Sequence, residues 1–151
     1  MSEPRTGLSM GEHQALTSKR WEITREAQDE LAAASHHSLG AAWDRGFFDD
    51  LVTPYLGVTK DTILRADTSV DKLAKLKVVF GGAGGTMTAG NSTALSDGAA
   101  TVLLGSEAWA RDNHLPVLAR FVDANVAAVD HPGGEDLLLA PVAATGRMLA
   151  R

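Results

Sequence analysis

Residues 85–93 read GTMTAGNST, and DGAA follows at 97–100. The cluster just before this stretch, GGAGG at 81–85, cannot hold a regular element, because glycine loses the most backbone freedom on ordering and has no side chain to bury. After the stretch, 97–104 becomes a continuous apolar run, which is typical of a strand covered on both faces inside an α/β sheet. The pattern predicts a glycine-rich loop that leads into a buried strand.

Helix signals dominate the first third of the chain. Ser9 and Glu12 have the S-x-x-E spacing in which each side chain satisfies a backbone N–H near the other, so a helix is predicted over 10–21. Thr24 offers a second N-cap, and Gly46 is a typical helix stop. A long second helix is therefore predicted between them.

The remaining segments alternate between strand and helix signals. We predict a short strand at 51–53, a loop from there to 67, a short amphipathic helix over 70–77 and an apolar triplet at 78–80. Farther along, we predict a helix over 106–113, a strand over 117–123 and a helix over 142–150. This order of elements indicates the α/β class.

The composition excludes several classes of partner. A chain of 151 residues has room for one ordinary domain. Its formal net charge is -5, and the sequence has no block of basic residues that would bind nucleic acid or an anionic membrane. The apolar stretches are far shorter than the roughly 20 residues of a membrane-spanning helix, and no secretory signal opens the chain, so we expect a cytoplasmic protein. Without any cysteine, the chain offers neither disulfide nor thiolate nucleophile.

The GTMTAGNST stretch closely resembles the G-T-V-T-A-G-N-S-S loop of the thiolase family, and DGAA resembles the strand that follows it there. Other segments resemble that family in the same order: Met10-Gly11, ITREAQD at 23–29 with Ser35-His36, KLAKLK at 72–77 and LLAP at 138–141. The resemblance covers nearly the whole chain. The family's nucleophilic cysteine and its N-E-A-F, G-H-P and C-x-G motifs do not occur in it.

The resemblance implies a partial thiolase fold of the α/β class. It consists of a helical coenzyme A-binding loop region plus strands and helices from two similar halves. Residues 1–80 would form most of that loop region, residues 81–115 the end of the N-terminal half, and residues 116–151 the start of the C-terminal half. The implied function belongs to an acetyl-CoA acetyltransferase or a 3-ketoacyl-CoA thiolase, with a leaning towards the thiolases of fatty-acid β-oxidation.

The resemblance also assigns contacts along coenzyme A. Met10 and Leu76 match apolar contacts along the cofactor. Ala89 and Gly90 match positions where small residues let the pantetheine arm approach the backbone. Thr93 would present a hydroxyl where the family usually has serine.

A cation is expected at the nucleotide end. Arg65 aligns with the family's nucleotide-contacting arginine, whose planar guanidinium pairs with phosphate and stacks on adenine. Lys72 stands where many relatives carry serine. Either it adds a phosphate contact or that corner of the site is rearranged, and the sequence leaves both interpretations open.

Other site types fit the residues poorly. The histidines lack carboxylate partners at ligand spacing, and DHPGGED at 130–136 is better explained as a turn than as a chelating loop, so we assign no metal. The glycine cluster lacks the Lys-Ser or Lys-Thr of a phosphate loop. Neither Ser92 nor Ser96 sits in a G-x-S-x-G motif, so we assign no catalytic residue to this chain.

Three hypotheses follow for function. The first is a thiolase segment that binds coenzyme A or acyl-CoA as substrate, without a permanent cofactor, and that is inactive alone. The second is a non-catalytic module that binds coenzyme A thioesters or pairs with another thiolase chain. The third is a split enzyme completed by a complementary chain. The family resemblance also implies a homo-oligomer for the complete enzyme.

Overall fold

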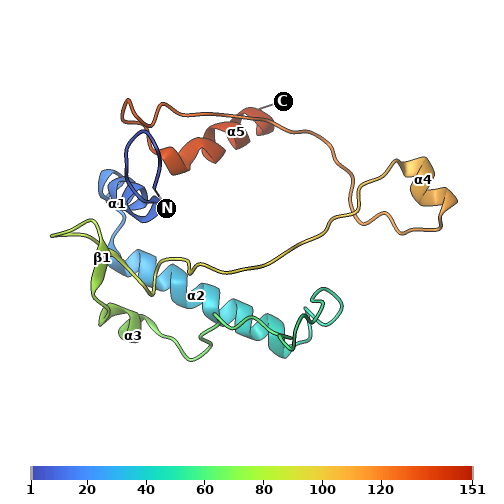
Figure 1. Cartoon of the computed structure of the whole chain (residues 1–151), viewed down its shortest axis with the longest axis horizontal. Coiled ribbons are helices and arrows are strands. Elements are labelled where there is room, and N and C mark those ends of the chain that lie inside the picture. Colours follow the sequence, from blue (N-terminus) through green and yellow to red (C-terminus); the bar gives the residue numbers. More distant parts are fainter. Residues whose placement is uncertain (1, 151) are drawn as a thin grey trace. The chain divides into compact units, whose positions relative to one another are not determined.

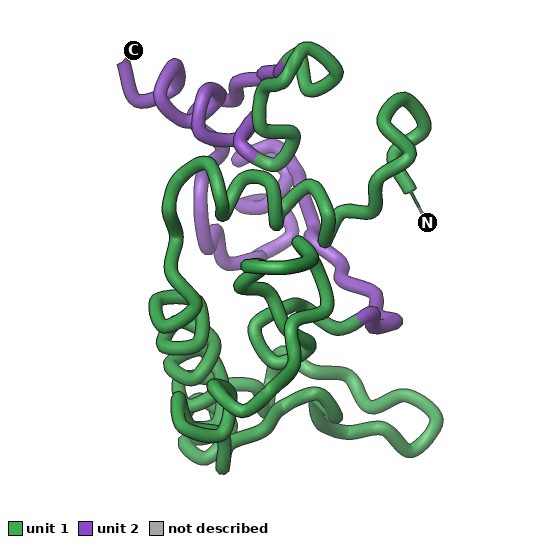
Figure 2. The backbone as a smooth tube through the Cα atoms, turned by 90° about the vertical axis from the view of Figure 1, so that its left-hand side faces the viewer, with its two compact units in different colours: residues 1–94, 130–138 green, residues 95–129, 139–151 purple. Residues whose placement is uncertain are grey.

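A computed structural model describes residues 2–150 and divides into two compact units, shown separately coloured in Figure 2. Unit 1 comprises residues 1–94 and 130–138, and unit 2 comprises residues 95–129 and 139–151. Most of the regular structure belongs to unit 1, which also carries the GTMTAGNST stretch.

Two helices open unit 1, as the sequence predicts. Helix α1 spans Met10–Arg20, and Ser9 and Glu12 form the expected capping box, with the Ser9 N–H donating to Glu12 at 2.7 Å. Helix α2 spans Arg25–Asp44 and is capped by the Thr24 side chain. Gly46 follows it with φ at +73°, a conformation that glycine adopts without a Cβ penalty. Both helix predictions are confirmed.

A short helix and a small sheet follow α2 in unit 1 (Figure 1). Helix α3 spans Val70–Ala74, so it ends before the predicted limit at 77, and it packs against α2. Strand β1, Val78–Phe80, pairs antiparallel with β2, Met87–Thr88. The strand β2 lies inside the stretch that the sequence predicts as loop throughout, so that prediction is wrong at these two residues.

Small apolar side chains make a thin core in unit 1. The buried apolar residues are Ala15, Ala33, Ala42, Leu73 and Met87. The helices and strands pack closely where the side chains are small. A Cβ added to Gly11 of α1 would lie 2.5 Å from the ring of Phe80 on β1. Such packing leaves little freedom to enlarge any side chain at these contacts.

The strand predicted at 51–53 is wrong. The segment is a turn followed by irregular backbone, and an isolated bridge joins Tyr55 to Val58 just beyond it. Pro54 removes a backbone donor there. No other described segment pairs with 51–53, so its apolar side chains stay largely exposed.

Unit 2 contains two helices connected by irregular chain. Helix α4 spans Glu107–Asp112, and helix α5 spans Ala140–Leu149, directly after a 3-10 turn at Leu137–Leu139. Both helices agree with the sequence predictions to within a few residues. The guanidinium of Arg120 forms a fork with the Glu107 carboxylate, with both N···O distances at 2.9 Å.

The predicted strands at 97–104 and 117–123 are both wrong for this structure. Neither segment is a strand, and Val102, Leu104 and Phe121 are 78%, 81% and 82% exposed. A strand needs a hydrogen-bonded neighbour, and a strand covered on both faces needs packed layers as well. Among residues 2–150 neither segment has such a neighbour.

Within residues 2–150, none of the helices combines the length and the apolar character needed to cross a membrane.

Candidate functional site

The GTMTAGNST stretch closes into a tight turn through its own side chains. The Thr88 N–H donates to the Asn91 side-chain oxygen at 2.7 Å. In return, the Thr88 hydroxyl oxygen accepts from the backbone N–H groups of Gly90 and Asn91 at 3.2 and 3.3 Å. Thr88 is fully buried. Short polar side chains thereby form the hydrogen bonds with the backbone that a paired β-strand would otherwise form.

A partly buried chain of polar groups, centred on the buried Asp29, ties this turn to helix α2. The Asn91 amide nitrogen donates to one oxygen of Asp29 at 2.9 Å, and Arg25 donates to the other at 2.7 Å. Asp29 is only 1% exposed, yet both of its oxygens are paired. The Arg25 guanidinium continues to the backbone oxygen of Leu73 at 2.6 Å. One carboxylate therefore fixes the turn, α2 and the end of α3 relative to each other.

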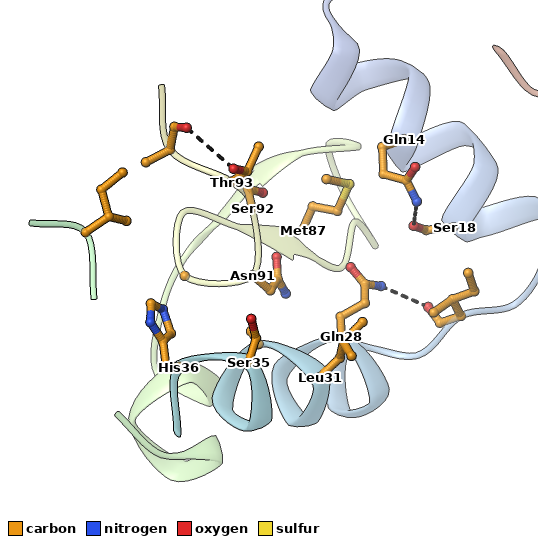
Figure 3. Close-up of a pocket in the computed structure, with 15 residues that line it drawn as sticks. Gln14, Ser18, Gln28, Leu31, Ser35, His36, Met87, Asn91, Ser92 and Thr93 are labelled. Atoms are coloured by element: carbon orange, nitrogen blue, oxygen red, sulfur yellow. Dashed lines mark hydrogen bonds between the residues drawn. The ribbon is translucent and has the colours of Figure 1, made fainter. Parts of the chain in front are cut away.

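A cavity of about 520 Å³ lies between this turn and the helices α1 and α2. Figure 3 shows Leu31, Ser35 and His36 of α2 facing the turn residues Asn91, Ser92 and Thr93. The cavity is also lined by Gln14 and Ser18 of α1, Gln28 of α2 and Met87 of β2. None of the lining residues is an aspartate, glutamate, lysine or arginine. The cavity therefore suits an uncharged ligand that carries hydrogen-bonding groups.

Ser92 is the turn residue with unused hydrogen-bonding capacity. Its hydroxyl oxygen is buried and has no hydrogen-bond partner among the described residues. Ser92 also lines the cavity. Because a buried polar group without a partner costs free energy, a ligand amide or carbonyl that reached it would be favoured.

The structure brings together half of the predicted contact residues. Gly90 and Thr93 both line the cavity. Leu76 packs on Gly90, because a Cβ added at Gly90 would clash with the Leu76 side chain and lie 2.6 Å from Leu73. The missing Cβ at Gly90 therefore makes room for leucine side chains as well as for any ligand.

The other predicted contacts lie away from the cavity lining. Met10 is 45% exposed at the first position of α1, and Ala89 is exposed at the start of the turn. The guanidinium of Arg65 is folded onto its own loop, where Nη1 donates to the backbone oxygens of Thr62 and Leu64 at 3.0 Å. Contact between Arg65 and a nucleotide would require that side chain to turn outward.

Lys72 is held by a neighbouring acid. Its ammonium group donates to the Asp67 carboxylate at 2.8 Å and to the Asp67 backbone oxygen at 2.6 Å. The hydrogen bond from Lys72 lowers the pKa of Asp67 below its usual value. This pair is exposed to solvent, so it is weak and a phosphate could displace the carboxylate.

Sequence reasoning missed the residues that organise the turn, namely Arg25, Asp29, Thr88 and Asn91. One usable signal was present, because Arg25 and Asp29 have opposite charges at the i,i+4 spacing of neighbouring positions on a helix. No group of three or more His, Asp or Glu side chains within residues 2–150 is placed to hold a metal ion.

The similarity to known proteins extends along the whole chain. This chain is 39% identical to the 3-ketoacyl-CoA thiolase of Serratia proteamaculans and 36% identical to that of Yersinia enterocolitica. Each alignment covers 100% of this chain and 36% of the relative. The chain therefore spans about a third of the length of these relatives.

Solved structures show the same likeness. The match to the acetyl-CoA acetyltransferase of Bacillus anthracis covers 85% of this chain and 34% of the acetyltransferase chain, with a TM-score of 0.78 and 39% sequence identity. Human mitochondrial 3-ketoacyl-CoA thiolase, solved in complex with CoA, matches 85% of this chain and 33% of its own, with a TM-score of 0.79 and 31% identity. The fold is therefore of the thiolase type.

The model of the thiolase N-terminal domain matches residues 1–108, which is more than half of the chain. That match includes the GTMTAGNST turn, the buried Asp29 and the cavity between them. The chain belongs to the thiolase family.

Proposed function

We propose that this chain binds coenzyme A or its thioesters, as the cofactor-binding portion of a thiolase that cleaves or forms 3-ketoacyl-CoA. The observation that carries the proposal is the cavity beside the family's GTMTAGNST turn, whose lining contains no aspartate, glutamate, lysine or arginine. On this proposal residues 1–80 form the coenzyme A clamp. Residues 81–115 end the N-terminal half of the enzyme, and residues 116–151 begin the C-terminal half.

The lining of the cavity fits the pantetheine arm better than the nucleotide. That arm is uncharged and carries amide groups, which match the serine hydroxyls and the glutamine and asparagine amides of the lining. The phosphates need cations, and Arg65 and Lys72 lie outside the lining residues. We therefore expect the arm to enter the cavity while the nucleotide stays near these two side chains.

Catalysis in the complete enzyme would proceed by thiolysis through an acyl-cysteine, with ping-pong kinetics. This chain contains no cysteine, so it supplies binding and orientation without a nucleophile. We expect purified chain to show no cleavage of acetoacetyl-CoA above the buffer rate. The measurement follows loss of the magnesium-enolate absorbance of acetoacetyl-CoA, and turnover that survives repurification would refute the assignment.

Arg65 tests the nucleotide end of the proposed site. We expect Arg65→Ala to weaken acetyl-CoA binding by about 1 to 3 kcal/mol, the scale of a charge-assisted hydrogen bond, in calorimetric titration. Arg111→Ala is the matched control, because Arg111 is an exposed arginine of unit 2 with an ion pair to Asp112. Equal affinities of the Arg65 and Arg111 variants would show that Arg65 only closes its own loop.

The alternative is that the chain is a non-catalytic binding module. Exposed apolar surface distinguishes such a module from a portion of a thiolase. An evolved module is expected to have a closed core and polar edges. The apolar residues of 102–104 and 117–122 are instead mostly exposed in unit 2. This exposure supports a portion of a larger thiolase fold, completed either within an oligomeric enzyme or by a complementary chain.

A further inference from the structure

Residues 130–136 form a compact turn that docks on one face of helix α1. The turn is closed internally, with the Glu135 N–H donating to the Asp130 backbone oxygen at 3.0 Å and the Gly133 N–H donating to the Asp130 side chain at 3.1 Å. It belongs to unit 1, although more than a hundred positions separate it from α1. This segment is called the clasp below.

Asp136 makes the main attachment of the clasp. Its carboxylate accepts from the Trp21 indole N–H at 2.9 Å and from the Thr17 hydroxyl at 3.1 Å, and it pairs with Arg20 at 3.1 Å. The Asp136 side chain is only 9% exposed. The hydrogen bond from Trp21, together with these other contacts, lowers the pKa of Asp136, so the group stays ionised at neutral pH.

A second contact of the clasp involves His13, about one helical turn before Thr17. The His131 ring meets the His13 ring edge-on, with 6.2 Å between centroids. The Glu3 carboxylate lies 3.3 Å from the far nitrogen of His131. Partial burial acts to raise the pKa of Glu3, but hydrogen bonds from the backbone N–H groups of Arg5 and Thr6 lower it to about 2. The clasp thus contacts one face of α1 through both of its ends, by hydrogen bonds at Asp136 and by a ring contact at His131.

The neighbouring stripe of α1 forms a wall of the candidate cavity. Gln14 and Ser18 both line the cavity, and the Gln14 amide donates to the Ser18 hydroxyl at 3.3 Å. Successive residues of a helix are rotated by about 100°, so this stripe adjoins the clasp-bound residues His13 and Thr17. Any rotation or fraying of α1 at the clasp therefore moves the cavity wall.

We propose that Asp136 is a positioning residue that holds α1 in place and thereby sets the wall of the cavity. It acts through Thr17, Arg20 and Trp21 without lining the cavity itself. The inference rests on the proposed function for its consequence, namely that the clasp tunes affinity for the uncharged arm of a thioester.

The absence of cysteine permits a direct test in the full chain. Ser18→Cys places the sole thiol of the protein at a cavity-lining position where the native residue is 2% exposed. We expect Asp136→Asn to speed its reaction with DTNB about tenfold, because local opening becomes easier when a buried charged acceptor is lost. Asp112→Asn, at an exposed acid of unit 2, should leave the rate unchanged, and Asp136→Glu should restore much of the protection.

Trp21→Phe keeps the test decisive if Asp136→Asn does not fold. It removes one donor to Asp136 and should speed labelling about threefold, a fraction of the full effect. Labelling rates within a factor of two of the parent for both Asp136→Asn and Trp21→Phe would overturn the clasp.

Calorimetry with acetyl-CoA separates the two proposals. We expect Asp136→Asn to raise the Kd about fivefold, with Asp112→Asn unchanged. Faster labelling combined with an unaltered Kd would overturn the positioning role. If the parent chain binds no acetyl-CoA, the proposed function fails, and the labelling ratio still decides whether the clasp holds α1.

Discussion

Asp29→Ala is expected to lower the free energy of unfolding of unit 1 by about 3 to 5 kcal/mol, the cost of breaking a buried charge pair from one side. The carboxylate is the common acceptor for Arg25 and Asn91, at 2.7 and 2.9 Å. Its removal leaves a guanidinium and an amide without their shared acceptor at a site that is nearly sealed from solvent. Urea unfolding followed by far-ultraviolet circular dichroism measures the loss.

Two companion variants make the Asp29 result specific. Asp112→Ala removes an exposed carboxylate that pairs with Arg111, and it should cost less than about 1 kcal/mol. Asp29→Asn keeps the shape of the side chain and one acceptor oxygen. Its loss of unfolding free energy should therefore lie between those of Asp29→Ala and Asp112→Ala. An Asp29→Ala chain as stable as the Asp112→Ala chain would mean that the network contributes no net stability. We also expect Asp29→Ala to abolish acetyl-CoA binding, because the turn loses its anchor on α2.

The helices could be predicted because their signals are local. Ser9 with Glu12, Thr24, and Ser106 each act within the first turn of the helix they cap, and the structure shows these side chains bonded as the spacing requires. Gly46 ends α2 for an equally local reason, its positive φ. Such features are complete within a few consecutive residues, so no knowledge of the remaining fold is needed.

The predicted strands failed because their signals describe surroundings rather than local bonds. The apolar run that ends at Leu104 indicates burial on both faces, which depends on layers that residues 2–150 do not place around it. Conversely, Met87 and Thr88 form a strand with almost no strand signal, because pairing with Val78 and Phe80 decides the outcome. Sheet structure is set by partners distant in sequence.

The same distinction divides the candidate site. The position of the turn followed from its residues, and Gly90 and Thr93 do line the cavity. The bond between Asn91 and Asp29 spans 62 positions, so no local pattern announces it. Arg65 was predicted from likeness alone, and its guanidinium conformation depends on carbonyl oxygens of the preceding loop. The type of a residue therefore predicts which contacts its side chain can make, whereas the folded structure decides which of those contacts form.

Gly85→Ala is expected to destabilise unit 1 by about 3 kcal/mol, the upper part of the usual range for inserted bulk. A Cβ at this position would clash with the backbone oxygen of Phe80 and lie 2.9 Å from Val78. Both residues belong to β1, so relief requires distorting the strand that pairs with β2 and holds the turn beside α2. Because the obstructing atom is backbone, rotating a side chain cannot make room.

Gly98→Ala is the matched control for that substitution, because a Cβ there would meet nothing within 4 Å and the residue has no positive φ. Its effect should lie within about 0.5 kcal/mol of zero, as for surface changes in general. Urea unfolding of the two variants, read alongside DTNB labelling in the Ser18→Cys background, separates loss of the sheet from loss of the clasp. If Gly85→Ala unfolded at the same urea concentration as Gly98→Ala, the close approach between 85 and β1 would not exist in solution, and neither would the fixed turn that the cavity depends on.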